Sequence, residues 1–152
     1  MVKHALLATC AIVVSFGADA AKAGTITYDD NFGVKTGWQM ASDDAYLGSR
    51  AGCFESLIRV GYDMKLEPSL AESWTQTGPK VWEFKLRKGV KFQNGEPLNA
   101  AAAVNALTNL LKAPVPARAF SPKLIAAVDA DGDDIVKITT IEPSVLLPAQ
   151  MG

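Results

Sequence analysis

Residues that support nucleophilic or metal chemistry are scarce in this sequence. Its 152 residues include one histidine, His4, and two cysteines, Cys10 and Cys53. A Ser-His-Asp or Cys-His nucleophile needs an imidazole to accept a proton, and a zinc site needs several His or Cys ligands. No glycine-rich segment has the spacing of a phosphate-binding loop. The sequence therefore predicts no catalytic residue, no cofactor and no metal site.

Carboxylates cluster in the last quarter of the sequence. Asp129, Asp131 and Asp133 have the spacing of the first three ligands of a calcium-binding loop. Such a loop requires glycine at position six and a bidentate glutamate at position twelve. Those positions hold Asp134 and Thr140. We therefore interpret the acidic stretch as the solvated turn of a hairpin.

Positive charge is concentrated in one segment, which contains Lys85, Arg87, Lys88 and Lys91. An anion-binding patch is one interpretation of these residues. Their alternation with large apolar residues instead favours the solvent-facing side of a strand. The net charge of -1 provides no basic field for nucleic acid, so we expect no nucleic-acid partner.

A loop near the N-terminus carries side chains suited to ligand contact. Trp38, Gln39 and Met40 offer an indole, an amide and a thioether. Packing at the edge of the core is the alternative, and the residues by themselves favour it. Cys53 lies within an apolar helical pattern, so we expect a buried packing residue rather than a reactive thiol.

The first 23 residues have the features of a secretory signal. Lys3 provides the positive charge, residues 5–18 form the apolar stretch, and Ala21-Lys22-Ala23 matches the cleavage pattern. Cleavage after Ala20 is the alternative. The apolar stretch is shorter than the roughly 20 residues that a membrane-spanning helix needs. Export with removal of residues 1–23 also removes His4 and Cys10, so no internal disulfide is possible.

Several secondary structure elements can be predicted from residue patterns. A helix capped by Ser42 should extend to about residue 58 because apolar residues recur at three- and four-residue intervals. Alternation predicts a strand over 82–87, and Asn99 should cap a helix over 100–112. The remaining expectations are a short strand at 25–28, a connecting stretch at 66–74, a tight turn at Asn94-Gly95 and a hairpin formed by 123–129 and 135–141.

Besides these predicted elements, the sequence contains one long motif and two shorter ones. Residues 82–100 read WEFKLRKGVKFQNGEPLNA, residues 54–57 read FESL and residues 68–74 read PSLAESW. Together with the hairpin that ends before Pro143, they resemble family 5 extracellular solute-binding proteins, the dipeptide, oligopeptide and nickel receptors of ABC importers. The family usually has an acidic pair where this chain has Ala102-Ala103. The lost carboxylates should weaken the helix by about 0.3–1 kcal/mol and leave the fold intact.

The resemblance implies an α/β fold of the periplasmic-binding-protein type II-like architecture, in which two lobes close over a ligand. Only its N-terminal portion would be present. Residues 24–41 would begin the ligand-facing lobe, and 42–152 would form most of a truncated accessory subdomain. Within this framework the possible ligand contacts are Asp30, Trp38, Gln39 and Met40.

The function implied by the resemblance is that of a periplasmic, monomeric, non-enzymatic receptor. It would capture di- and oligopeptides and deliver them to the permease subunits of an ABC transporter in the inner membrane. A nickel or metal-chelate receptor is the alternative within the family. A small secreted non-catalytic interaction domain is the alternative outside it.

Overall fold

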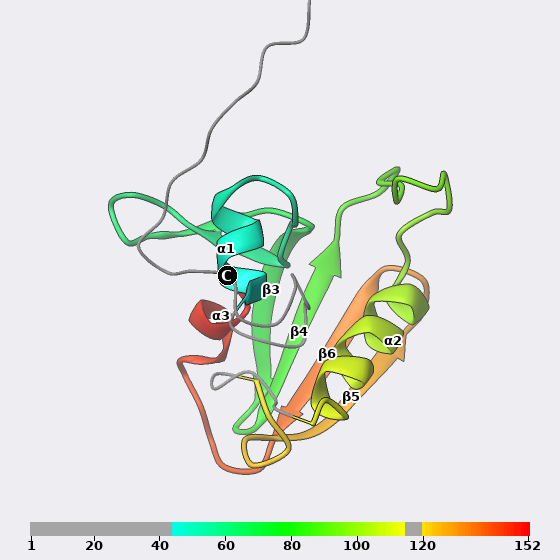
Figure 1. Cartoon of the computed structure of the whole chain (residues 1–152). Helices are drawn as coiled ribbons and strands as arrows, with labels where there is room; N and C mark the ends of the chain where they lie inside the picture. Colours follow the sequence, from blue (N-terminus) through cyan, green and yellow to red (C-terminus); the bar gives the residue numbers. More distant parts are fainter. Residues whose placement is uncertain (1–43, 115–119) are drawn as a thin grey trace, which may run out of the picture.

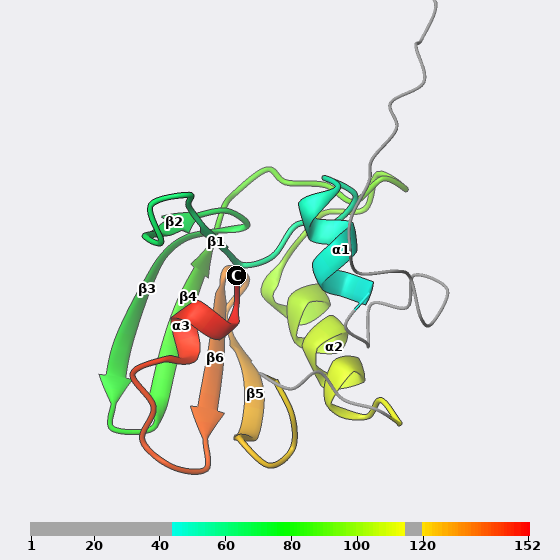
Figure 2. The same cartoon turned by 60° about the vertical axis from the view of Figure 1, so that its left-hand side comes forward.

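The computed structural model describes residues 44–114 and 120–152. The elements in chain order are α1 (Asp44–Arg50), β1 (Ile58–Val60), β2 (Leu66–Pro68), β3 (Ala71–Gly78), β4 (Val81–Leu86), α2 (Ala100–Leu111), β5 (Ile125–Asp131), β6 (Ile135–Thr140) and α3 (Leu147–Gln150). They form a four-stranded antiparallel sheet in the order β3-β4-β6-β5 (Figure 1) and a two-stranded sheet of β1 and β2 (Figure 2). Helix α2 packs against β5 and β6 (Figure 2).

The alternation predicted for residues 82–87 is confirmed in β4. Phe84 and Leu86 are buried, whereas Lys85 between them is exposed. Strand β4 lies between β3 and β6, with Phe84 opposite Trp74 on one side and Val136 on the other. The period-two pattern thus places the large apolar groups on the covered face of the sheet.

The predicted C-terminal hairpin is also confirmed. Strands β5 and β6 pair in antiparallel register, and Gly132 in the turn between them has φ 67°. Glycine adopts this left-handed conformation without the steric cost of a side chain. The acidic residues Asp129, Asp131 and Asp133 are exposed. No group of His, Cys, Asp or Glu able to hold a metal ion occurs among the described residues.

Lys137 lies between two carboxylates on the open face of the four-stranded sheet. Its Nζ is 3.1 Å from Asp131 Oδ2 and 3.4 Å from Glu83 Oε1. The hydrogen bond and charge of Asp131, followed by those of Glu83, raise the pKa of Lys137 above its ordinary value of 10.5. Because the folded-state pKa is the higher one, this contribution to stability is complete below pH 10.5 and is lost as the pH rises through the folded-state value.

Replacement of Lys137 by glutamine should therefore make the fold less sensitive to alkaline pH. Urea unfolding at a series of pH values from neutral to alkaline measures this dependence. The difference in stability between wild type and Lys137→Gln should shrink as the pH rises beyond about 10.5. Lys91→Gln is the control, because exposed Lys91 forms no ion pair with described residues. A difference for Lys137→Gln that is independent of pH would contradict the prediction.

Helix α2 begins as its sequence predicts. The Asn99 side chain accepts a hydrogen bond from the Ala102 N–H at 2.8 Å, and Asn99 itself has extended backbone angles. This bond satisfies one of the N–H groups that lack a partner in the first helical turn. Ala100 and Ala103 are buried, so the small side chains allow the helix to approach the sheet closely.

Asn99→Ala should reduce the free energy of unfolding by about 1 kcal/mol, within a range of about 0.5–2 kcal/mol for lost N-caps. Chemical unfolding monitored by circular dichroism measures this change. The matched control is Asn105→Ala on the exposed side of the same helix. It should be neutral or slightly stabilising because alanine has the higher helix propensity. Equal losses in both variants would show that the cap contributes nothing.

Helix α1 is much shorter than predicted. It ends at Arg50, not near residue 58, and the predicted cap Ser42 lies outside the described residues. Gly52 has φ 75° and donates to the Ser49 carbonyl at 3.0 Å, while the Cys53 N–H donates to the Gly48 carbonyl at 2.8 Å. This is the Schellman arrangement that terminates helices at a left-handed glycine. The apolar stripe therefore includes the helix, the loop after it and the start of β1.

The prediction of a connecting stretch over residues 66–74 is wrong. This stretch contains β2 and the first half of β3. Pro68 is tolerated because it is the last residue of β2, whose outer side lacks a partner strand in the described structure. Strand β3 is an edge strand, and its exposed polar residues provide little alternation for a sequence pattern to detect.

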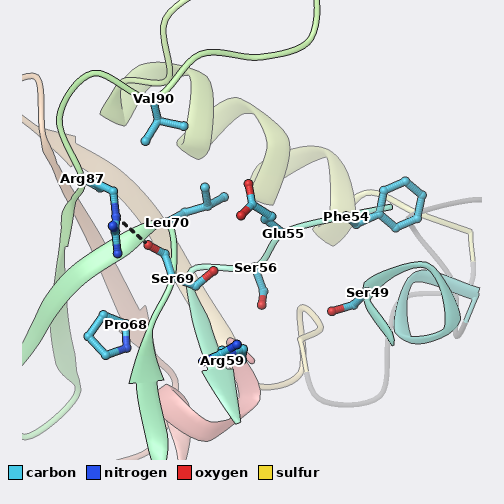
Figure 3. Close-up of a pocket in the computed structure, with 10 residues that line it drawn as sticks. All are labelled: Ser49, Phe54, Glu55, Ser56, Arg59, Pro68, Ser69, Leu70, Arg87 and Val90. Carbon is cyan, nitrogen blue, oxygen red and sulfur yellow. Dashed lines mark hydrogen bonds between the residues drawn. The ribbon is translucent and has the colours of Figure 1, made fainter. Parts of the chain in front are cut away.

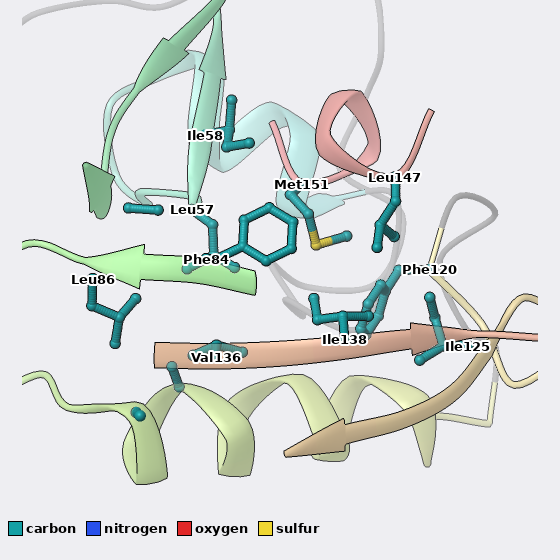
Figure 4. Packing of buried hydrophobic residues seen from close by; sticks show 13 residues of the cluster. Leu57, Ile58, Phe84, Leu86, Phe120, Ile125, Val136, Ile138, Leu147 and Met151 are labelled. Carbon is teal, nitrogen blue, oxygen red and sulfur yellow. The ribbon is translucent and has the colours of Figure 1, made fainter. Parts of the chain in front are cut away.

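One hydrophobic core joins the two sheets with α2 and α3. Figure 4 shows Phe84 of β4 near Leu57, Met151 and Ile138. The buried cluster comprises Leu57, Ile58, Ala71, Phe84, Leu86, Ala100, Ala103, Phe120, Ile125, Val136, Ile138, Leu147 and Met151. The segment before α3 is tied to the sheet by the Trp82 Nε1–H, which donates to the Ser144 carbonyl at 2.8 Å.

Candidate functional site: an open cavity at the junction of the two sheets

A cavity lies where the β1–β2 sheet meets the four-stranded sheet. It is open to solvent and has a volume of about 430 Å³. Its wall is formed by α1 and the loop after it, by the β1–β2 hairpin, and by the segment after β4 (Figure 3). The lining residues are Ser49, Phe54, Glu55, Ser56, Arg59, Pro68, Ser69, Leu70, Arg87 and Val90.

Backbone hydrogen bonds hold three distant segments together at this junction. The Leu70 N–H donates to the Ser56 carbonyl at 3.2 Å, and the Ala71 N–H donates to the Leu57 carbonyl at 2.8 Å. The Arg87 N–H donates to the Leu70 carbonyl at 2.8 Å. The cavity wall is therefore fixed by main-chain bonds rather than by a single flexible loop.

The polar side chains of the cavity differ in how they are paired. Arg87 Nε donates to the Ser69 carbonyl at 3.2 Å, a bond drawn in Figure 3. Arg59 forms an ion pair with Glu67. Glu55 is exposed and forms no ion pair with described residues. Ser56 Oγ donates to the Ile58 carbonyl at 2.6 Å.

The cavity combines these polar groups with apolar surface from Phe54, Leu70 and Val90. Charged and hydroxyl groups around an apolar surface can bind a small amphiphilic molecule. The lining has no histidine or cysteine that could act as base or nucleophile. The lining groups can hold a ligand through hydrogen bonds and apolar contact.

Gly48 in α1 leaves space for the aromatic ring that lines the cavity. A Cβ atom at this position would lie 2.2 Å from Phe54 Cε2 and 2.3 Å from Phe54 Cδ2. Gly48→Ala should destabilise the fold by about 1–3 kcal/mol, as overpacking does, although alanine is the better helix former by about 1 kcal/mol. Urea unfolding measures the net change.

The clash with Phe54 can be tested separately from other effects of the Gly48 substitution. In a Phe54→Ala background the ring is absent, so Gly48→Ala should become neutral or stabilising by up to about 1 kcal/mol. The same destabilisation in both backgrounds would rule out the ring contact as its cause.

The ligand residues expected from the sequence, Asp30, Trp38, Gln39 and Met40, lie outside the described residues. Their role stays a prediction. Sequence reasoning assigned no site role to Glu55 or to the serines of the cavity, because these residues come together only in the folded chain. Their short-range pattern indicated a helix through residues 55 and 56, which the structure does not contain.

The buried position expected for Cys53 is wrong, since this residue is exposed. The reason is the helix end at Gly52, which places Cys53 in the loop after the turn. The solvent-facing interpretation of the basic segment is confirmed for Lys85, which pairs with Glu72 at 2.9 Å, and for Lys88, which pairs with Asp134 at 3.6 Å. Arg87 differs, because it also lines the cavity.

A smaller cavity of about 190 Å³ lies beside α3. It is lined by Lys123, Leu124, Thr140, Ile141, Glu142, Pro143, Ser144 and Gln150. Across residues 44–114 and 120–152, the helices are too short or too polar to span a bilayer.

Solved structures place this fold among the substrate-binding proteins of ABC transporters. The crystal structure of a nickel ABC transporter protein from Bacillus halodurans matches with a TM-score of 0.61 and 33% identity, over 70% of this chain and 22% of that chain. The α/β fold and its periplasmic-binding-protein type are thereby confirmed, with this chain corresponding to part of the larger architecture.

Sequence comparison defines the family. Residues 65–152 match the model of the bacterial extracellular solute-binding proteins, family 5. The glutathione-binding protein GsiB of Escherichia coli K12 is 33% identical over 144 residues, which cover 91% of this chain and 26% of that protein. The nickel-binding periplasmic protein of the same strain is 47% identical over 51 residues, or 33% of this chain and 10% of that protein. The chain belongs to the family 5 extracellular solute-binding proteins, and it spans about a quarter of the length of the glutathione-binding relative.

Proposed function

We propose that this chain is part of the periplasmic substrate-binding component of an ABC importer that captures short peptides and delivers them to the membrane permease. The proposal is carried by the similarity to the glutathione-binding protein, which extends over 91% of the chain. Glutathione is a tripeptide, and the open cavity offers charged, hydroxyl and apolar groups suited to such a molecule. The same observation supports a role in binding without catalysis.

A nickel or metal-chelate ligand is the second candidate. It is favoured by the 47% identity to the nickel-binding protein over 51 residues and by the fold match to the nickel transporter protein of Bacillus halodurans. The described residues provide no cluster of His, Cys, Asp or Glu for direct metal coordination. Since the longer sequence match is to a peptide binder, we place the peptide first.

Other parts of the proposal concern residues outside the described structure. We infer that residues 1–23 direct export to the periplasm and are cleaved after Ala23 or Ala20. We further infer that 24–41 begin the ligand-facing lobe, with Asp30, Trp38, Gln39 and Met40 as ligand contacts, and that 42–152 belong mostly to an accessory subdomain. The receptor would act as a monomer.

Native mass spectrometry of the complete gene product, purified from its host, tests the proposed ligand class. We expect a series of added masses that match short peptides. Unfolding, dialysis and refolding should remove these masses, and added glutathione or trialanine should restore a bound form. Recovery of nickel without any peptide, together with no binding of either added peptide, would overturn the peptide proposal in favour of the second candidate.

A further inference from the structure

The exposed turn at Asn94-Gly95 places two groups that can react with each other side by side. Asn94 is the one asparagine of the sequence that is followed by glycine. Residues 91–97 are all exposed, and Gly95 has φ 88°. Glycine has no Cβ that could shield its own backbone nitrogen. A side-chain amide and an accessible main-chain nitrogen are therefore adjacent on the protein surface.

Hydrogen bonds fix the positions of both groups within the turn. The Gly95 N–H donates to the Phe92 carbonyl at 2.9 Å, and the Phe92 N–H donates to the Glu96 carbonyl at 2.8 Å. Asn94 Oδ1 accepts from the Glu96 N–H at 3.0 Å, which is the arrangement of an Asx turn. The ring closed by this bond contains the Gly95 peptide, so the Asn94 side chain is folded back toward the nitrogen of that peptide.

This turn can open while the core stays folded. Residues 91–97 contribute no side chain to the buried cluster, and the hydrogen bonds of the turn lie among exposed residues. Segments with few buried apolar contacts and solvent-exposed backbone hydrogen bonds open at a low cost in free energy. Opening releases the Gly95 N–H from the Phe92 carbonyl, and the nitrogen can then lose its proton to solvent and react.

We propose that Asn94 is a site of spontaneous deamidation in the folded protein. The Gly95 nitrogen attacks Asn94 Cγ, so a nitrogen–carbon bond forms and the Cγ–Nδ2 bond breaks. The side-chain nitrogen leaves as ammonia, with a proton that replaces the one lost from the Gly95 amide. One water molecule then opens the cyclic imide: attack at Cγ gives aspartate, and attack at the main-chain carbonyl gives isoaspartate. The net reaction is hydrolysis of an amide, which requires no oxidant or reductant.

The two products differ in their effect on the turn. Aspartate keeps an acceptor oxygen for the Glu96 N–H. Isoaspartate carries the main chain through its own Cβ and Cγ, which adds one atom before Gly95. The bonds that join Phe92 to Gly95 and to Glu96 then lose their register. Because this turn lies shortly before the Asn99 cap of α2, we expect the isoaspartate form to unfold at a lower temperature and the aspartate form to match wild type.

Two asparagines of helix α2 serve as internal controls. Asn105 and Asn109 are as exposed as Asn94, but Ala106 and Leu110 follow them. The residue after each control therefore has a Cβ, and its N–H group is held by the helical hydrogen bonds.

Incubation of the complete gene product at mildly alkaline pH in water labelled with heavy oxygen tests the proposal. Peptide mapping by mass spectrometry then locates the label, which marks acid formed during the incubation because the incoming oxygen comes from solvent. We expect label at residue 94 as both aspartate and isoaspartate, at least about 10-fold faster than at Asn105 or Asn109. The rate should rise with hydroxide concentration. Asn94→Gln should show no label at residue 94, since its cyclisation would need a larger ring.

Unfolding in urea separates the chemistry from the protection given by the turn. Wild type should react faster in urea than in its native state because the bond from Gly95 to Phe92 is lost. In urea, Gly95→Ala should slow the reaction by about 10-fold or more because its Cβ shields the nitrogen. This comparison does not depend on whether the variant folds.

Three outcomes would overturn the proposal. The first is labelling of native Asn94 no faster than that of the two control asparagines. The second is conversion that occurs only in urea, because opening of the turn would then be insufficient. The third is an equal rate for wild type and Gly95→Ala in urea, which would exclude the Gly95 nitrogen as the attacking atom. None of these measurements involves a ligand, so their results are independent of the proposed function.

Discussion

Phe84→Ala is expected to reduce the free energy of unfolding by about 3–5 kcal/mol, the range for truncation of a buried phenylalanine. Phe84 is fully buried in the central strand β4 and pairs across the sheet with Trp74 and Val136. Its removal leaves a cavity between the sheet and the residues that Figure 4 shows around the ring, Leu57 and Met151 among them. Urea unfolding monitored by circular dichroism measures the loss.

Phe92→Ala is the matched control for Phe84→Ala. Phe92 lies in the same sequence motif but is 40% exposed. Because it buries less apolar surface, its truncation should reduce the free energy of unfolding by less than about 1.5 kcal/mol. Phe84→Leu should fall between the two because it leaves a smaller cavity. Similar costs for Phe84→Ala and Phe92→Ala would show that β4 does not form the centre of the core.

Ile58→Ala has the second largest expected effect, a loss of about 2–5 kcal/mol. Ile58 begins β1, is fully buried and donates its N–H to the Met151 carbonyl at 3.2 Å. Its side chain therefore links the small sheet and the end of the chain to the common core. Because β1 follows directly on the cavity-lining segment 54–56, this variant should also loosen the cavity wall.

Two measurements distinguish this effect from a local change. Ile58→Val should cost only about 0.5–1.5 kcal/mol, since it removes a single methylene. Hydrogen exchange of the Ala71 N–H, which donates to the Leu57 carbonyl, should become faster in Ile58→Ala. An unchanged exchange rate with a full loss of stability would show that the small sheet is not coupled to the junction.

The elements predicted well from sequence are those that short-range physics specifies. Alternation places the large residues of β4 on one face, Asn99 satisfies an N–H group of the turn that follows it, and Gly95 adopts φ 88° in the predicted Asn-Gly turn. Each depends on residues a few positions apart, so the pattern carries the information. The motif over residues 82–100 was specific enough to indicate the family that the comparisons confirm.

The errors arise where the spacing of apolar residues does not determine the backbone. The stripe of apolar residues from 46 to 58 has helical spacing, yet the backbone leaves the helix at Gly52 and the later residues reach the core from a loop and a strand. Strand β3 has few apolar residues. It is the edge strand of the sheet and pairs only with β4, so most of its side chains are exposed. In β3 the pairing with β4 overrides a weak local pattern, whereas the helix ends within the apolar stripe because Gly52 adopts the left-handed conformation.

By itself the amino-acid sequence determined that residues 82–87 form an amphipathic strand, that Asn99 caps a helix, that Asn94-Gly95 forms a turn, and that residues 24–152 contain no histidine and a single cysteine. The tertiary structure alone decided that Glu55 and Arg87 share a cavity, that Cys53 is exposed, and that β1 joins the common core. Cys53 is exposed because the helix ends at Gly52. The shared cavity and the position of β1 depend on hydrogen bonds between Ser56 and Leu70, Leu70 and Arg87, and Ile58 and Met151. Such pairs are distant in sequence, so no local periodicity records them, and they form only when the core brings the segments together.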